Sequence, residues 1–409
     1  MRILFLAVQP PLPLDNGGRL RTFHLLEQLS ARAQVALVCL DREPGSGLPP
    51  IGASEISDAL PDLNRVASVP APAGRKRLRQ LTALAGRSSY TLAMHRSPAL
   101  ERATRDLTLE FEPDLIHCDS EFAAWVRPRH PQSGPWVLAP HNHESKLKAQ
   151  LADTAAEWPR RLAYRNEAQA LAALERKYAA KFEHWLAVSE REAGEFRALG
   201  AASVAVAPNG VDPMPPPAAP TPLAQGEPLR LLFVGSLNYE PNRDGLEWFV
   251  EEVAPVVRER VPIDIEVVGP GRRGPELPGV RYLGRVDDLD SAYERAHAAV
   301  VPLRVGAGSR LKVLEALARG VPLVSTSVGA EGFDLVDGEH ALIADEPATL
   351  AERLALLQAS LQGHGGLAQS LVTAAYDFAS DYFWPGIGER LAAQYGEWAE
   401  PSDDQRRGA

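Results

Sequence analysis

The stretch PMPPPAAPTPLAQGEPLRLLFVGS, residues 213–236, divides the sequence into two parts. Seven of the sixteen residues at 213–228 are proline, a composition that favours extended polyproline conformations and excludes a helix or a central strand. The apolar run at 229–236 that follows is typical of a strand buried on both faces of a parallel sheet. We therefore predict a linker at 213–228 and a second domain that starts at 229.

Strands and helices alternate on both sides of this linker. On the N-terminal side we expect strands at 2–8, 34–40, 115–118, 136–139, 185–188 and 204–207, with helices at 19–31 and 160–182. On the C-terminal side we expect strands at 229–236, 263–268, 280–283, 298–302, 321–325 and 341–344, with helices near 246–257, 309–318, 349–361 and 384–398. This alternation predicts two doubly wound α/β domains.

The composition is that of a packed globular enzyme, with 409 residues, enough for two to three domains, of which 45% are hydrophobic. A net charge of −10 gives no basic surface for nucleic acid. The only cysteines, Cys39 and Cys118, each stand beside an apolar run, so we expect no disulfide and a reducing compartment, the cytoplasm. The opening run at 2–8 is too short to span a membrane and has no cleavage site behind it, which indicates a strand rather than a signal peptide.

Several catalytic motifs are missing from the sequence. No phosphate-binding loop of the GxxxxGK[ST] type occurs, and no GxGxxG follows the first strand, so nucleotide hydrolysis and dinucleotide binding lose support. The sequence also lacks a GxSxG elbow, a CxxC pair and an HExxH helix, which argues against hydrolase and zinc chemistry.

The segment PLRVGAGSRLKVLE, residues 302–315, runs from a strand end through a Gly-rich loop into a helix. Free N–H groups at a helix N-terminus bind anions, and Arg310 and Lys312 add positive charge there. These cations oppose the helix dipole, which favours an intervening anion such as a diphosphate; the alternative is an ordinary loop with two solvated basic residues. Glu315 on the same helix either accepts hydrogen bonds from sugar hydroxyls or forms a surface salt bridge.

Five motifs occur together in one order and spacing. They are GGRLRTFHLLEQLS at 17–30, HNHES at 141–145, PNGVD at 208–212, GSLNYEPNRDGLEWF at 235–249 and LKVLEALARGVPLVSTSVGAEG at 311–332. In this combination, nearly the whole chain resembles the retaining family-4 glycosyltransferases.

The resemblance implies the GT-B fold, in which two Rossmann-like doubly wound domains face each other across a cleft. The expected parts are an acceptor-side domain at 1–212, the linker at 213–228, a donor-nucleotide domain at 229–382, a helix at 383–400 that crosses back to the first domain, and a flexible tail at 401–409.

By this resemblance, Glu315 would bind the donor ribose, while Arg310 and Lys312 would meet the diphosphate and His141 the transferred sugar. Residues 306–309 would lie against the donor sugar, the turn at 284–286 would face the base, and the glycines at 17 and 18 would approach the phosphates from the first domain. The implied catalytic residues are His141, Arg310 and Lys312, and the implied donor-binding residues are Gly17, Gly18, Gly235, Ser236, Gly284, Arg285, Val286, Gly306, Ala307, Gly308, Ser309 and Glu315.

The sequence departs from the family pattern at three positions. Ala307 stands eight residues before Glu315, where the family commonly has a Glu, so only backbone is left there to contact the donor sugar. Ser236 and Pro241 replace the usual Arg and Lys after the first strand of the second domain. We therefore expect Arg310 and Lys312 to supply the charge that the phosphates need.

Two further stretches carry charge. The basic tract GRKRLRQLTALAGR at 74–87 predicts either a solvated helix face or a peripheral contact with anionic lipid at the inner face of the membrane. The Asp288-Leu289-Asp290 triplet has the spacing of a metal-binding pair, but Asp287 or Asp288 precedes a helical stretch, so capping of that helix accounts for the acids without a metal.

The predicted function is that of a cytoplasmic, retaining glycosyltransferase with a UDP- or GDP-linked donor and with no cofactor or metal. The acceptor would be a hydroxyl of a glycan, a lipid-linked or a small molecule, in the assembly of surface polysaccharide or another glycoconjugate. Two alternatives stay open: a nucleotide-sugar 2-epimerase of the same fold, and a nucleotide-sugar-binding protein without turnover, which Ala307 makes conceivable.

Overall fold

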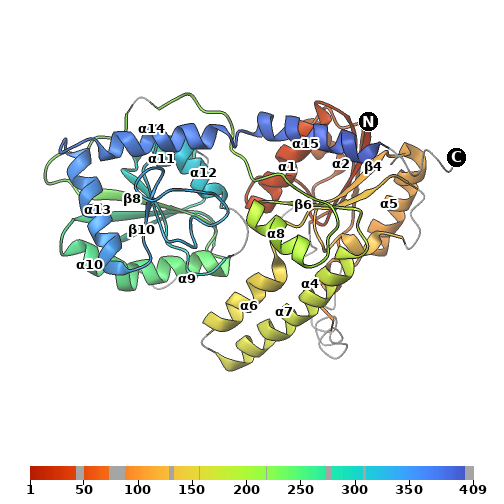
Figure 1. The fold of residues 1–409 in the computed structure, drawn as a ribbon, viewed down its shortest axis with the longest axis horizontal. Helices are drawn as coiled ribbons and strands as arrows, with labels where there is room; N and C mark the ends of the chain where they lie inside the picture. Colours follow the sequence, from red (N-terminus) through yellow and green to blue (C-terminus); the bar gives the residue numbers. More distant parts are fainter. Residues whose placement is uncertain are drawn as a thin grey trace. The chain divides into compact units, whose positions relative to one another are not determined.

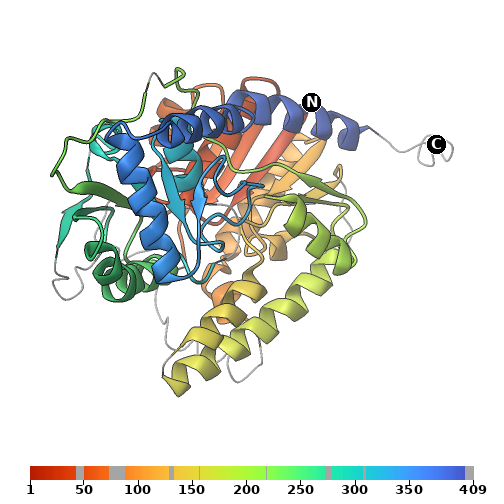
Figure 2. The ribbon, with the colours of Figure 1, turned by 60° about the vertical axis from the view of Figure 1, so that its left-hand side comes forward.

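The chain folds into two compact units (Figures 1 and 2). The computed structural model describes residues 1–42, 50–72, 88–128, 133–155, 157–217, 219–271, 279–286, 288–306 and 310–400. Unit 1 contains the chain up to Pro208 and again from Trp384 onward, and unit 2 contains Asn209–Phe383. None of the helices in these described ranges is long and apolar enough to cross a membrane.

Unit 1 is built on a sheet in which every pair of neighbouring strands is parallel. Its strands in the described residues are β1 (Arg2–Ala7), β2 (Gln34–Leu40), β3 (Arg65–Val69), β4 (Leu115–Cys118), β5 (Trp136–Leu138), β6 (His184–Ala187) and β7 (Val204–Val206). They are ordered β3-β2-β1-β4-β5-β6-β7. β1 and β2 are buried almost end to end, as strands covered on both faces must be.

The helices of unit 1 connect and cover these strands. They are α1 (Gly17–Ser30), α2 (Ala53–Ala59), α4 (Tyr90–His95), α5 (Pro98–Phe111), a short 3₁₀ turn (Ala124–Val126), α6 (Glu144–Thr154), α7 (Trp158–Ala179), α8 (Glu190–Ala198) and α15 (Trp384–Ala399). α6 and α7 lie side by side as a helical hairpin in both views (Figures 1 and 2).

Unit 2 repeats this plan with a second parallel sheet. Its described strands are β8 (Leu229–Val234), β9 (Ile263–Val268), β10 (Val280–Gly284), β11 (Ala298–Val301), β12 (Leu323–Ser325) and β13 (Leu342–Ile343), in the order β10-β9-β8-β11-β12-β13. Its described helices are α9 (Glu240–Trp248), a π-helical turn (Phe249–Val253), α10 (Ala254–Arg258), α11 (Asp290–Arg295), α12 (Leu311–Ala318), α13 (Pro347–Leu361) and α14 (Leu367–Ser380).

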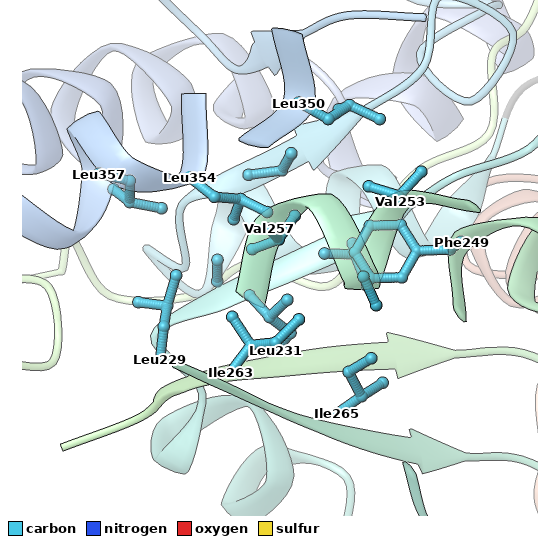
Figure 3. Packing of buried hydrophobic residues seen from close by; sticks show 14 of the residues in the cluster. Leu229, Leu231, Phe249, Val253, Val257, Ile263, Ile265, Leu350, Leu354 and Leu357 are labelled. Carbon is cyan, nitrogen blue, oxygen red and sulfur yellow. The ribbon is translucent and has the colours of Figure 1, made fainter. Parts of the chain in front are cut away.

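One core of unit 2 lies between its sheet and the layer that contains α10 and α13 (Figure 3). Leu231 and Ile265 of the sheet, Val253 and Val257 of the π-helical turn and α10, and Leu354 of α13 are at most 1% exposed. Burial of these side chains fixes the sheet and, with it, the loops at the ends of its strands.

The order of the strands reverses once in each sheet. In unit 1 the chain moves outward from β1 to β2 and β3 and then returns to the other side of β1 with β4; in unit 2 the same happens around β8 and β11. Loops that leave the carboxyl ends of such a strand pair diverge, which leaves room for a ligand at the edge of the sheet. A site is therefore expected beyond β1 and β4 in unit 1, and beyond β8 and β11 in unit 2.

Helix α15 packs against α1 within unit 1. The ring of Trp384 stacks on that of His24 at a centroid distance of 4.9 Å, and α15 and α1 approach so closely that a Cβ on Gly388 would lie 2.4 Å from Gln28 Cβ. The C-terminal helix is thus an integral part of the first unit.

The proline-rich segment at 213–228 belongs to unit 2, and its described residues form neither a helix nor a strand. The side chain of Leu223 is buried in the unit 2 core, Tyr376 Oη donates to Met214 O at 2.6 Å, and Thr221 Oγ1 donates to Glu294 O at 3.0 Å. The chain divides into its two units at Pro208, shortly before this segment begins.

The predicted fold class is confirmed, since both units are doubly wound parallel α/β structures. Cys39 and Cys118 are free, buried thiols, as expected. The predictions gave no range for strand β3 at the edge of its sheet or for helices α2, α4, α5, α6, α8, α11 and α14. The tract at 74–87 lies outside the described residues.

We predict that Leu354→Ala destabilises the protein by about 2–5 kcal/mol, because it leaves a cavity in the core of Figure 3. Leu356→Ala on the same helix is the control, since Leu356 is 54% exposed, and its effect should stay within about 0.5 kcal/mol. Denaturant unfolding of the two variants provides the measurement. Equal losses would mean that α13 does not pack as the structure shows.

Candidate functional site

The end of β8 and the first turn of α12 meet in unit 2. Lys312 Nζ donates to Asn242 Oδ1 at 2.7 Å, and Asn242 Nδ2 in turn donates to Ser236 O at 3.0 Å. A Cβ on Gly235 would lie 2.8 Å from Lys312 Nζ and 2.7 Å from Asn242 Nδ2, so a side chain at this position would displace both groups. Glycine at this position therefore leaves room for the ammonium group beside the backbone.

The Lys312 ammonium is held in an unfavourable environment for a cation. Burial, with a smaller contribution from the neighbouring charge of Arg310, lowers the pKa of Lys312 to about 7. Its Nζ also lies 4.8 Å from the ring centroid of Phe233 on β8. An anion bound at this edge would stabilise the protonated form of Lys312, which burial disfavours.

Glu315 lies one turn further along α12. Its Oε2 accepts a hydrogen bond from Tyr293 Oη of α11 at 3.1 Å, and burial raises the pKa of Glu315. The carboxyl group is thus fixed in place while it retains acceptor capacity for hydroxyl groups.

Arg310 is the residue that immediately precedes α12. Its guanidinium lies against Gly306, where a Cβ would be 2.3 Å from Nη2, and Nη2 is 3.7 Å from Glu331 Oε2. Arg310 is only 8% exposed, so it is a buried, partnered cation rather than a solvated one.

The predicted base-binding turn follows β10. Gly284 has a φ of +70°, and its carbonyl accepts from Gly269 N at 2.8 Å, which ties the turn to the end of β9. Arg285 and Val286 continue from it. The predicted sugar-binding residues Ala307, Gly308 and Ser309 lie outside the described part of the chain.

In unit 1, the predicted residues Gly17, Gly18 and His141 come together beyond β1. Gly17 begins α1, whose N-terminus is capped by Asn16 Oδ1 accepting from Arg19 N at 3.0 Å. A Cβ on Gly18 would lie 3.0 Å from His141 Nδ1. The N-terminus of α1 and His141 therefore lie in close contact.

Asp119 stands behind His141 and was not predicted as a site residue. It directly follows β4, its side chain is buried, and its Oδ1 lies 3.1 Å from His141 Nε2. Burial alone would raise the pKa of Asp119, but His141 and His117 outweigh this effect and lower it. The sequence feature that could have identified Asp119 is its place directly after the apolar strand at 115–118.

The second histidine of the HNHES motif has a structural environment. Its Nδ1 lies 2.6 Å from Glu195 Oε2 and its Nε2 lies 3.3 Å from Glu175 Oε2. Burial opposes protonation of His143, but these two carboxylates outweigh it and raise its pKa to about 9. The protonated ring thus joins α7 and α8 behind the loop that carries His141.

The two acids of the Asp-x-Asp triplet have protein partners. Asp288 Oδ1 accepts from Ser291 N at 3.0 Å at the start of α11, and Asp290 Oδ1 lies 2.6 Å from Arg319 Nη2. Within the described residues, no group of three or more His, Cys, Asp or Glu side chains could hold a metal ion.

Most of the described predicted residues thus form two groups, each at the edge where the strand order of its own sheet reverses, while the turn at Gly284 follows the outer strand β10. A sequence model described as "Glycosyl transferase 4-like domain" matches residues 16–210, and one described as "Glycosyl transferases group 1" matches residues 228–360. The chain belongs to the group 1 glycosyltransferases.

Curated relatives of this glycosyltransferase differ in how much of their length it matches. A glycogen synthase from Mycobacterium tuberculosis is 25% identical over 430 residues, which cover 97% of this chain and 94% of that protein. An uncharacterized 44.6 kDa protein in the cps region of Klebsiella pneumoniae is 27% identical over 147 residues, 32% of this chain and 38% of that protein. The chain therefore matches little more than a third of the Klebsiella protein's length.

Solved structures share the fold of this glycosyltransferase. Sucrose-phosphate synthase (tll1590) from Thermosynechococcus elongatus has a TM-score of 0.71 at 18% identity, with 97% of this chain and 98% of that chain covered. Alr3699/HepE from Anabaena, in complex with UDP-glucose, has a TM-score of 0.63 at 15% identity, with 97% and 100% covered. Together with the family matches, these likenesses confirm the predicted GT-B fold.

Proposed function

We propose that this glycosyltransferase moves a sugar from a nucleotide-diphosphate donor, UDP- or GDP-linked, to a hydroxyl of a glycan, lipid-linked or small-molecule acceptor, with retention of anomeric configuration. Support for a UDP-linked donor comes from HepE, which binds UDP-glucose and shares the fold. The Klebsiella relative in a cps region supports a role in surface polysaccharide assembly.

The observation that carries this proposal is the position of Lys312 Nζ against Gly235 at the end of β8. A diphosphate at this edge would lie beside the ammonium group of Lys312, the backbone of Gly235 and the N-terminus of α12. Negative charge grows on the leaving diphosphate as the glycosidic bond breaks, so a preorganised cation there stabilises the transition state more than the bound donor.

The remaining roles follow from the two groups of residues. Glu315, held by Tyr293, would accept hydrogen bonds from the ribose hydroxyls, and the turn at Gly284 would face the base. His141 in unit 1 would contact the transferred sugar. The acceptor hydroxyl is the nucleophile, so the chemistry requires positioning and charge stabilisation from the protein rather than a protein nucleophile.

The proposal includes a reaction without a metal ion or a cofactor. Asp288 and Asp290 are engaged in capping α11 and in an ion pair with Arg319. The positive charge for the diphosphate would come from Lys312, with Arg310 beside it, and a divalent ion would compete with these cations for the same oxygens.

A transfer assay tests the function. After a thermal-shift screen with UDP- and GDP-sugars, the preferred donor is incubated with candidate acceptors, and the product is analysed by NMR. We expect a product with the anomeric configuration of the donor, formed at an unchanged rate in excess EDTA. Epimerised free sugar would support the 2-epimerase instead. Loss of transfer in EDTA that Mg²⁺ or Mn²⁺ restores would refute the metal-free reaction.

Lys312 predicts how donor affinity depends on pH. Lys312 has a pKa of about 7 in the free protein, so near neutral pH only part of it is protonated. A bound diphosphate favours the ammonium form and raises this pKa, so binding takes up a proton from solvent. Affinity should therefore be flat below pH 7 and fall above it, by up to about tenfold per pH unit. Calorimetry with the UDP- or GDP-sugar in buffers of different ionisation enthalpy measures the proton uptake.

Lys312→Gln should abolish the uptake and weaken binding by about 1.5–3 kcal/mol, the range for a hydrogen bond to a charged group. Lys177→Gln on the exposed surface of α7 is the matched control and should change neither quantity. Undiminished proton uptake in Lys312→Gln would place the diphosphate elsewhere.

A further inference from the structure

A chain of buried polar side chains runs through unit 1 from α15 to His141. Tyr395 Oη of α15 lies 2.5 Å from His117 Nδ1, and His117 Nε2 lies 3.3 Å from Asp119 Oδ1. The same Oδ1 lies 3.1 Å from His141 Nε2. Tyr395, His117 and Asp119 are at most 2% exposed, so solvent cannot substitute for any of these contacts.

The protons on this chain follow from its chemistry. Burial lowers the pKa of His117, which keeps its ring neutral with a single N–H, and burial raises the pKa of Tyr395, which keeps its hydroxyl protonated. The ionised carboxylate of Asp119 can only accept hydrogen bonds, so the His117 proton lies on Nε2. Nδ1 of His117 then accepts from the Tyr395 hydroxyl.

Asp119 holds its position through its second oxygen. Thr22 Oγ1 of α1 lies 2.5 Å from Asp119 Oδ2, and Asp119 N donates to Leu6 O of β1 at 2.9 Å. The carboxylate is therefore fixed between β4 and α1 before any ligand arrives. His141 Nε2 faces this carboxylate at ion-pair distance, although the two groups are not aligned for a hydrogen bond.

The other nitrogen of His141, Nδ1, lies close to Gly18 at the start of α1. His141 Nδ1 and Gln9 Nε2 each lie 3.0 Å from the position that a Cβ on Gly18 would occupy. One amide donor and one ring nitrogen thus pack closely against the backbone of Gly18, where a side chain would crowd both, and the His141 side chain stays 21% exposed.

We propose that Asp119 is the positioning residue of His141, and that it keeps the proton of the neutral ring on Nε2 so that Nδ1 accepts a hydrogen bond from a hydroxyl of the transferred sugar. This rests on the proposed function, from which the sugar substrate is taken. A hydroxyl can donate to His141 Nδ1 and accept from the Gln9 amide, whereas a phosphate oxygen can only accept. The group that His141 Nδ1 and the Gln9 amide would bind beside Gly18 is therefore a sugar hydroxyl rather than a phosphate oxygen.

The tautomer of His141 is measurable without substrate. Nitrogen-15 NMR of the full chain with labelled histidine distinguishes protonated from unprotonated ring nitrogens, and a His141→Asn variant identifies the signals of His141 among the 10 histidines. We expect the proton on Nε2 in the wild type and a mixture of tautomers in Asp119→Asn. A wild-type ring protonated on Nδ1 alone would overturn the proposal, whether or not Asp119→Asn folds.

Kinetics provide a second readout that a purely structural role would not change. The wild type should prefer the donor over its deoxy analogue at the contacted hydroxyl by about tenfold, the effect of one hydrogen bond. Asp119→Asn should lower kcat on the order of 10- to 100-fold, as loss of the outer partner of an oriented histidine does, and should remove this preference. His141→Ala should remove the same preference, and the double variant should lose little more.

Thr104→Val is the matched control, because Thr104 is a buried polar residue of α5 whose hydroxyl donates to Leu100 O, away from this chain of contacts. It should keep the preference for the hydroxyl even where it lowers stability. Additive losses in the double variant, or an unchanged preference in Asp119→Asn, would refute the role of Asp119. If no donor is turned over at all, the proposed function fails, and the NMR result still decides the tautomer.

Discussion

The parallel sheets restrict where this chain can place polar groups. Their central strands, such as β1 and β2, are buried almost completely, so charged side chains within them would lose their hydration without compensation. Polar residues instead follow the carboxyl ends of the strands, and the reversal of strand order opens a gap there in each unit. Asp119 after β4 and Gly235 after β8 each lie beside such a reversal, between β1 and β4 in unit 1 and between β8 and β11 in unit 2.

The two units stabilise a buried charged group in different ways. Unit 2 holds an ammonium group whose pKa is lowered by burial, so an anionic ligand gains from completing the charge balance. Unit 1 holds a carboxylate, that of Asp119, whose pKa is lowered because His141 and His117 lie against it. The first arrangement favours binding of a diphosphate, and the second fixes the direction in which a neutral histidine accepts a hydrogen bond.

The sequence predicts this fold well where burial is nearly uniform, as in β2, whose bounds match the prediction, because its continuous apolar run leaves little ambiguity. It fails for β3, a half-buried edge strand whose residues RVASV carry no clear pattern. Helix α14 has an apolar repeat at Ala368, Leu371, Val372 and Ala375 and could have been predicted. Lys312 and Glu315 stood out in the loop and helix at 302–315, and the resemblance then implied their roles. Their partners Asn242 and Tyr293 lie 70 and 22 residues away, and no local pattern shows such pairings.

The central claim is that the nucleotide diphosphate is held where β8 ends and α12 begins. Hydrogen–deuterium exchange of the full chain, with and without saturating UDP-glucose and, in parallel, GDP-mannose, tests it most directly, because bound phosphates protect the amides that contact them. The account predicts that at least one of these ligands protects the loop after β8, which includes Gly235 and Ser236, together with the first turn of α12. Protection confined to other parts of the chain, or none at these two segments with either ligand, would contradict it.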